Sequence, residues 1–287
     1  MMIRMLLIMM VPFVCFSQTT HSEDIPVNNL LKEKENLDTK RKASFNLEEI
    51  KVRWKKAALE NCPGVPCVVT PPPPSFTCGT STVSDIDGNT YNTVLIGAQC
   101  WTKENLKVTK YNDGTLIGDS TNSTWGTAAI GARTGYDGSV VPLSDYVGTF
   151  GYLYNWYAVN DARKICPSGW HVPTDPEWTI MIQQLDNTAS ATTVGVQSTM
   201  AGTLMKKNDV LWITNTGTNT SGFSVLPGGY RYSVGSFDGI RGLAVFWSAT
   251  EYGSNPWYRY LFDNPDRVYR SNDKIKSVGA SVRCLRD

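Results

Sequence analysis

Apolar residues run without interruption near the start of the chain, from residue 5 to residue 16, after a single arginine. A helix needs about 20 apolar residues to cross a bilayer, so this run is too short for a membrane span and is typical of a secretory signal peptide. Small residues at Cys15 and Ser17 suit signal peptidase. We therefore predict a signal peptide over residues 1–17 and a mature chain that begins at Gln18.

The next segment, residues 18–75, has the pattern of a stalk. Residues 18–43 are polar and charged with little to bury, which favours a loosely ordered spacer. Residues 46–60 repeat apolar positions at helical spacing, which predicts one amphipathic helix that packs on the domain or self-associates with a partner chain. Four prolines at 71–74 predict an extended, semi-rigid linker. The apolar face of the helix consists of Leu47, Ile50, Trp54 and Ala57.

From residue 76 to residue 287, apolar and polar residues alternate over short stretches between turn residues, which predicts a head domain of short strands. The turn at residues 87–89 precedes such a stretch and predicts a β-hairpin. Asp85, Asp87 and Asn89 also have the alternating spacing of a calcium loop. The glycine at the sixth position and the glutamate at the twelfth position of such a loop are missing, so these residues are weak calcium candidates.

The main helix of the head begins inside the stretch CPSGWHVPTDPEW, residues 166–178. Thr174 at the N-cap and Glu177 three residues later form a capping box, while Asp175 and Pro176 suit the first turn. We predict a helix over about residues 174–185. Its buried face would consist of Trp178, Met181, Ile182 and Leu185.

The same stretch contains Cys166 and His171, which raises the question of a zinc site or a nucleophile. The only other histidine of the chain is His21 in the stalk, and there is no CxxC pair, so the ligands of a zinc site are missing. A cysteine nucleophile would need a free thiolate in an oxidising compartment. We therefore interpret this stretch as structural.

The charge of the chain is balanced, with 27 Lys and Arg against 26 Asp and Glu and a formal net charge of +1. The head has no basic stripe, on which the electrostatic recognition of nucleic acids depends. No other apolar run reaches membrane-spanning length. We therefore expect neither nucleic-acid binding nor a transmembrane segment in the mature chain.

Cysteines remain at six positions after the signal peptide: 62, 67, 78, 100, 166 and 284. An even number in an exported chain indicates disulfides, although six cysteines allow 15 pairings. Cys62 and Cys67 flank a Pro-Gly loop and could form a local bridge. Lipidation at Cys15 is the alternative to cleavage after Ser17, but the three residues before Cys15 match a lipobox poorly.

Several motifs of the head resemble those of one family, in the same order along the chain. They are DIDGNTYNTVLIGAQCWTKENL at 85–106, GYLYNWYAV at 151–159, the stretch at 166–178, TNTSGFSVLPGGYR at 218–231, FWSAT at 246–250 and the terminal GASVRCLRD. On these motifs, which extend over nearly all of residues 78–287, the head is identified as a member of the Fibrobacter succinogenes major paralogous domain family. This family occurs in exported proteins of Bacteroidota and relatives.

The motifs WHVPTDPEW and SVRC also resemble, remotely, the formylglycine-generating enzymes and hence the C-type-lectin-like fold. The resemblance implies an α+β fold, a twisted antiparallel sheet with one main helix and long loops, in which the first and last strands pair. It places a terminal strand at 280–285 in the central sheet and implies the disulfides Cys166–Cys284 and Cys78–Cys100. Formylglycine-generating enzymes use two cysteines near the chain end, whereas this region has only Cys284, so we do not expect an enzyme.

The stretch 249–270 is rich in aromatic, amide and acidic residues and falls where lectin-like folds place their variable ligand loops. Aromatic faces stack on sugars or peptide side chains, and amides and carboxylates bind hydroxyl groups or calcium. The alternation within 257–262 would equally suit a strand with one core face. The ligand-binding candidates are Glu251, Tyr252, Asn255, Trp257, Tyr258, Asp263, Asn264 and Asp266.

These features predict an exported, non-catalytic binding or adhesion-type module at the cell surface, in the periplasm or in the medium. Its ligand would be a glycan or a protein, and no cofactor is expected apart from the weak calcium option. One alternative is a structural or assembly subunit of the cell envelope that self-associates through the helix at 46–60. The other is a cryptic hydrolase.

Overall fold

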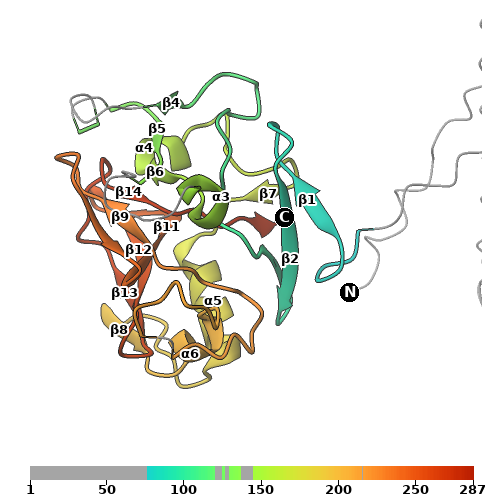
Figure 1. The fold of residues 1–287 in the computed structure, drawn as a ribbon, viewed down its shortest axis with the longest axis vertical. Coiled ribbons are helices and arrows are strands. Elements are labelled where there is room, and N and C mark those ends of the chain that lie inside the picture. The colour runs from blue at the N-terminus through green and yellow to red at the C-terminus, as the bar shows by residue number, and fades with distance from the viewer. Residues whose placement is uncertain (1–75, 120–124, 127–128, 137–144, 215) are drawn as a thin grey trace, which may run out of the picture. The chain divides into compact units, whose positions relative to one another are not determined.

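The computed structural model describes residues 76–119, 125–126, 129–136, 145–214 and 216–287. The signal peptide at 1–17, the helix at 46–60, the proline linker at 71–74 and the Cys62–Cys67 bridge lie outside the described residues, so these predictions are not tested. In the described part, strands predominate and helices are few and short (Figure 1). The head is therefore a sheet-rich fold, as the sequence predicts.

A five-stranded antiparallel sheet joins strands from both ends of the head. Its order is β1-β2-β3-β15-β7, so the last strand lies between the third and the seventh. The turn predicted at residues 87–89 connects β1 to β2, which confirms the hairpin. The bounds are β1 (Thr82–Ser84), β2 (Thr90–Ile96), β3 (Gln99–Thr102), β7 (Trp170–His171) and β15 (Leu285–Arg286).

A larger, mixed sheet forms the other half of the head. Its order is β4-β5-β6-β14-β9-β11-β12-β13-β8, with β10 paired to β9 outside this path. The pairs β4–β5 and β9–β11 are parallel, and the remaining pairs are antiparallel. The bounds are β4 (Gly118–Asp119), β5 (Ala132–Thr134), β6 (Leu153–Asn155), β8 (Gly195–Ser198), β9 (Gly228–Arg231), β10 (Phe237–Ile240), β11 (Leu243–Tyr252), β12 (Asn255–Phe262), β13 (Val268–Ser271) and β14 (Gly279–Ala280).

The four described helices are α3 (Tyr146–Phe150), α4 (Trp156–Val159), α5 (Asp175–Leu185) and α6 (Ala201–Met205). In Figure 1, α5 and α6 lie at the lower end, between β8 and β13 on one side and β2 on the other. The buried face of α5 packs against residues of both sheets, including Trp101 and Phe246. None of the helices in the described ranges has both the length and the apolar character needed to span a bilayer.

Helix α5 confirms the helix predicted from the sequence. Its N-cap is Thr174, and the Thr174–Glu177 capping box is formed in both directions. Trp178, Met181 and Ile182 are buried, whereas Leu185 is only partly buried against the same core. The local sequence therefore fixes where this helix begins.

The closing segment differs from the single strand expected at 280–285. It consists of two short strands in different sheets, β14 beside β6 and β9, and β15 beside β3 and β7. Between them the chain crosses from one sheet to the other, and the buried Arg283 side chain donates to the carbonyls of Thr102, Phe223 and Ser224. The last strand pairs with β3 rather than with the first strand, β1. One continuous strand would leave the buried guanidinium without these acceptors.

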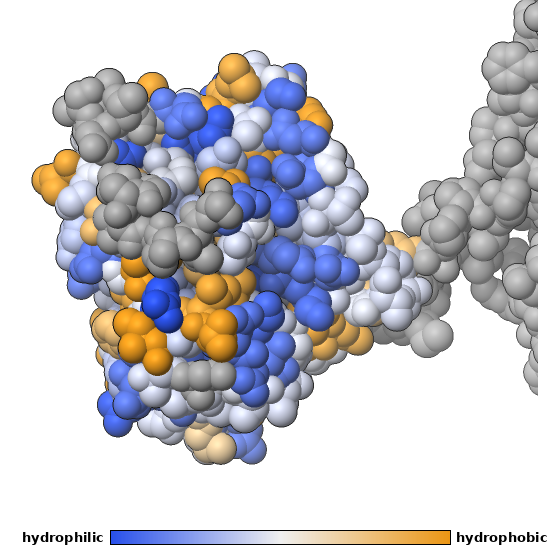
Figure 2. All heavy atoms as spheres, in the orientation of Figure 1, coloured by the Kyte–Doolittle hydropathy of each residue, from blue (hydrophilic) through white to orange (hydrophobic). Residues whose placement is uncertain are grey.

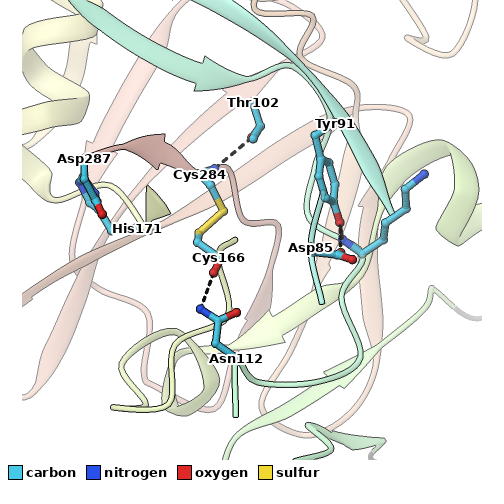
Figure 3. The surroundings of a disulfide bond; sticks show 9 residues. Asp85, Tyr91, Thr102, Asn112, Cys166, His171, Cys284 and Asp287 are labelled. Carbon is cyan, nitrogen blue, oxygen red and sulfur yellow. Dashed lines mark hydrogen bonds and ion pairs between the residues drawn. A yellow bond between two sulfur atoms is a disulfide. The ribbon is translucent and has the colours of Figure 1, made fainter. Parts of the chain in front are cut away.

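Both disulfides implied for the head are present and are confirmed. Cys78 is bonded to Cys100 across 22 residues, and Cys166 to Cys284 across 118 residues. Cys166 and Cys284 are both buried in the core (Figure 3). Cys78 is only partly buried, near the start of the described residues.

The two bonds should differ in their contribution to stability. By the chain-entropy relation, a cross-link over the longer loop stabilises by about 5 kcal/mol and one over the shorter loop by about 3 kcal/mol. We expect the double variant C166A/C284A to lose more free energy of unfolding in urea than C78A/C100A. An equal or larger loss for C78A/C100A would contradict this order.

Candidate functional site

His171, the one histidine of the head, is held between two carboxylates. Its Nδ1 lies 2.6 Å from Asp287 Oδ1 (Figure 3). Its Nε2 lies 3.1 Å from Glu177 Oε1. Both ring nitrogens of His171 are therefore engaged by carboxylates of the fold. His171 thus connects the start of α5 to the end of β15.

Glu177 has three further reasons to remain charged. Burial acts to raise the pKa of Glu177, but hydrogen bonds from the Thr174 backbone and side chain, together with the charge of His171, hold it below its ordinary value. The Thr174 N–H and hydroxyl both donate to Glu177 Oε2 at 2.7 Å. His171, Thr174 and Glu177 of the stretch 166–178 therefore stabilise the start of α5 and its contact with the chain end.

The calcium candidates form a closed set of hydrogen bonds within the β1–β2 turn. Asp85 accepts from the N–H groups of Asp87 and Asn89 through Oδ1, and from Asn89 and Tyr91 side chains through Oδ2. Asp87 accepts from Thr109 and forms an ion pair with Lys110. These donors occupy the carboxylate oxygens that a calcium ion would need. Nowhere in the described ranges do three or more His, Cys, Asp or Glu residues gather in a metal-binding arrangement.

A buried ionic cluster at the start of α5 was not predicted. Asp175 accepts from Arg259 Nη1 at 2.7 Å and from two nitrogens of Arg270 at 2.7 and 2.9 Å. Arg259 is fully buried and also donates to Gln197 and Thr179. Burial acts to raise the pKa of Asp175, but the hydrogen bonds and charges of the two arginines hold it below its ordinary value. This cluster ties α5 to strands β12 and β13.

The candidates within 249–270 lie mostly in strands, and 257–262 lies in β12. The single core face of the strand alternative is wrong for the first half of this stretch, because the consecutive residues Trp257, Tyr258 and Arg259 are all buried. Trp257 and Tyr258 are buried, with Arg270 3.5 Å from the centre of the Trp257 ring and Asp273 accepting from the Tyr258 hydroxyl. Asp266 forms an ion pair with the fully buried Lys206. Glu251, Tyr252 and Asn264 are exposed, and Asn255 and Asp263 are partly buried.

A hollow of about 300 Å³ lies beside α4. Trp156 and Tyr157 of α4, Asn160, Arg163 and Lys276 are among its lining residues. Lys276 forms an ion pair with Glu251 and lies 5.0 Å from the centre of the Trp156 ring. The hollow therefore connects with one of the predicted ligand residues.

The walls of this hollow are held rigidly. The Asn155 side chain caps α4 by accepting from Ala158 N–H, and it also bonds the backbone of Ala132 and Ile130. Trp156 Nε1 donates to the Ser248 carbonyl at 2.9 Å. In contrast, the side chains of Tyr157 and Asn160 make no hydrogen bond or ring contact with any described residue.

Tyr111 lies behind the wall of the hollow and has an unpaired hydroxyl. It is buried beneath the Arg163 guanidinium, which lies 3.9 Å from the ring centre. Among the described residues, its hydroxyl lacks a hydrogen-bond partner. Burial and the nearby Asp161 carboxylate raise the pKa of Tyr111 to about 12. A Cβ at Gly131 would lie 1.8 Å from this hydroxyl, so only glycine allows the approach.

A second hollow, of about 480 Å³, lies beside the β1–β2 turn. Asp87, Asn89, Lys107, Asp145 and Tyr152 are among its lining residues. Several of its polar groups are used by the fold, because Asp87 and Asn89 belong to the turn and Asp145 caps α3. The hollow beside α4 therefore has the larger share of side chains that make no contact within the fold.

Sequence reasoning missed Asn160, Arg163 and Lys276 as parts of this site. The aromatic pair in GYLYNWYAV was the available signal, but Trp156 and Tyr157 are alike in sequence, whereas one is buried and the other partly exposed. Lys276 lies more than 100 residues further along the chain than α4. Local sequence patterns cannot predict a contact over this separation.

Removal of the Asp175 charge should destabilise the head strongly. In D175N the buried Arg259 loses its ionised partner, which typically costs about 3–5 kcal/mol. Urea denaturation of the oxidised protein measures the loss, and T188A, which removes a hydroxyl that binds Asp186 near the surface, serves as a matched polar control.

The same variant should alter the response to acid. Because the folded pKa of Asp175 is lowered, its contribution is present above its ordinary pKa of about 3.9 and is lost as pH falls through the folded value. D175N should therefore lose less stability than the wild type between about pH 5 and pH 2. A parallel decline would contradict the assignment.

Calcium should not affect the stability of the head, because the oxygens of Asp85 and Asp87 are already used. We expect the same melting temperature in EDTA and in about 5 mM calcium, a concentration above the Kd of extracellular calcium modules. A rise of several degrees that D85N abolishes would show that a calcium site exists at the turn.

Comparison with known proteins agrees with the motifs of the head. No curated protein and no solved structure is significantly similar to the chain. The Fibrobacter succinogenes major domain matches residues 94–286, about two thirds of the chain, including α4, α5 and the closing segment. The chain belongs to the Fibrobacter succinogenes major domain family.

Proposed function

We propose that the head is a non-catalytic binding module that holds a short, hydroxyl-rich glycan segment in the hollow beside α4 and at the tip of the β11–β12 hairpin. The proposal rests on the side chains of Tyr157 and Asn160, which make no hydrogen bond or ring contact with a described residue. Both side chains line a hollow with rigid walls, yet no described residue uses their ring, hydroxyl or amide. Groups that the fold leaves unused on a rigid frame are available to a ligand.

The chemistry of the hollow favours a neutral, polar ligand. Arg163 is paired with Asp161, and Lys276 is paired with Glu251, so the charges at the rim largely cancel. An aromatic ring stacks on the apolar face of a sugar, while an amide both donates to and accepts from hydroxyl groups. The volume of about 300 Å³ is at the lower end of the range for small-ligand pockets, about 300–1,000 Å³. One or two sugar units would suit this size.

The exposed residues of the predicted ligand stretch extend the same surface. Glu251 touches the hollow through Lys276. Tyr252, which follows it, is 65% exposed, and its ring centre lies 5.6 Å from that of Trp257. We propose that Tyr252 contacts the part of the ligand that extends beyond the hollow.

Non-catalytic action is supported by the way in which the reactive groups of the head are used. The four described cysteines are in disulfides, and both nitrogens of His171 bind carboxylates. A hydrolase of the Ser-His type would need the imidazole as a free base. A cryptic hydrolase would therefore need a different constellation.

We further propose that the protein is exported through the segment 1–17 and that the head is a variant of the C-type-lectin-like arrangement. The two disulfides support export, because such bonds persist in oxidising compartments. The position of β15 inside a sheet that begins with the first strands supports the lectin-like comparison.

The binding proposal is tested on a glycan array and then by calorimetry with the best oligosaccharide. Loss of the stacking ring in Y157A should weaken binding about 5- to 30-fold, and loss of the amide in N160A about 2- to 10-fold. The matched control is Y232A, which removes an exposed tyrosine from the β9–β10 turn. All three variants should keep the melting temperature of the wild type within a few degrees.

A peptide array run in parallel separates a protein ligand from a glycan. Binding to peptides alone, or glycan binding that Y157A leaves unchanged, would refute the proposed site. The absence of any binding partner on either array, with normal folding, would remove the binding function itself.

A further inference from the structure

A second surface of the head has features of a docking site and lies outside the hollow. The loop 209–214 exposes two aliphatic side chains, Val210 at 81% and Ile213 at 67%. Single exposed apolar residues are common on protein surfaces, whereas apolar residues that lie together are a feature of interaction sites. The space-filling view shows apolar residues gathered around hydrophilic ones on the lower left of the drawn face (Figure 2).

Arg241 is the charged residue of this surface. Its Nε and Nη2 donate to the carbonyls of Leu211 and Val210, both at 3.4 Å. Its own carbonyl accepts from the Ile213 N–H at 3.0 Å. Arg241 therefore lies directly beside both exposed aliphatic residues.

The Arg241 guanidinium has no acidic partner among the described residues. The nearest acid in sequence on the loop, Asp209, is paired with Lys207 at 2.8 Å. The two bonds that Arg241 makes to carbonyls are long and exposed, and such bonds contribute little to stability. Nη1 makes no hydrogen bond to any described residue, so the cation keeps a free donor face.

The backbone at Arg241 is in the left-handed region, with a φ of 67°. Glycine adopts this conformation at little cost, whereas arginine is strained there. The strain, combined with weak intramolecular bonds, indicates that the side chain has a use outside the fold.

The loop is also held in place before any partner arrives. Trp212, between the two exposed residues, is buried, and its Nε1 donates to the Val225 carbonyl. The buried Trp212 therefore fixes the positions of Val210 and Ile213 on the surface. A fixed surface loses less conformational entropy on binding than a mobile one.

We propose that Val210, Ile213 and Arg241, here named the Arg241 patch, dock an acidic peptide segment of a partner protein in which Asp or Glu is flanked by large apolar residues. The carboxylate would form an ion pair with the guanidinium, and the apolar side chains would cover Val210 and Ile213. Charge complementarity selects this occupant, because Arg241, which forms no ion pair with a described residue, lies beside the two exposed aliphatic side chains of Val210 and Ile213. A glycan would leave the aliphatic surface exposed.

The test uses a phage library of random 12-residue peptides selected against the oxidised head, followed by fluorescence polarisation with the enriched peptides. We expect enrichment of peptides that combine an acid with neighbouring Leu, Ile or Phe. R241G removes the cation and relieves the strained φ, so it should bind these peptides about tenfold more weakly or worse while melting at the same or a higher temperature.

Matched variants separate the contributions of charge and apolar contact. I213D should lose binding, R241K should retain part of it, and V194D, which places the same charge at an exposed aliphatic residue elsewhere, should have no effect. Selection without acidic-apolar enrichment, or equal affinity of R241G and wild type, would overturn the proposal. So would Arg241-dependent binding to vesicles of anionic lipid in the absence of peptide binding.

Discussion

The disulfide between Cys166 and Cys284 is the constraint on which the rest of the head depends. It joins the segment before α5 to the point where the closing segment enters the first sheet. Thr102 holds Cys284 on the backbone side, because its N–H donates to the Cys284 carbonyl and its hydroxyl accepts from the Cys284 N–H. With Cys284 fixed, β15 lies between β3 and β7, and Asp287 reaches His171.

Buried charged side chains also hold the elements of the head together, and the acids that pair with them are not free for other chemistry. A buried arginine or lysine is costly unless ionic partners and hydrogen bonds compensate for its desolvation. Arg259 has Asp175, and Lys206 has Asp266 together with two carbonyls. Arg283 lacks a carboxylate within ion-pair distance among the described residues and relies on carbonyls and Asn105; burial lowers its pKa to about 9. Asp175 and Asp266, which seem available in the sequence, are therefore already used by the fold.

The parts of the fold that follow from local chemistry could be predicted from the sequence. The capping box determines where α5 begins, and the turn at 87–89 joins β1 to β2. The disulfides of the head followed from the family resemblance, not from spacing. In contrast, the partners of Asp175 lie 84 and 95 residues away, so helical periodicity explained this acid only as a residue of the first turn.

The candidate site shows the same division between local and distant information. Aromatic enrichment pointed to the stretch 249–270, but β12 is covered on both faces at Trp257 and Tyr258, which are buried, whereas Glu251 and Tyr252 near the hairpin tip are exposed. The hollow itself depends on Lys276 meeting α4, which only the topology of β14 beside β6 brings about. Composition can indicate a stretch that binds a ligand, but the tertiary contacts decide which residues of that stretch are exposed.

The four described cysteines of the head serve as cross-links that hold a rigid scaffold for its surface residues. The most direct measurement is peptide mapping by mass spectrometry of the exported protein, alkylated before reduction. We expect linked peptides for Cys166–Cys284 and Cys78–Cys100, without alkylation at any of these positions. Alkylated Cys166 and Cys284 in folded protein would contradict it.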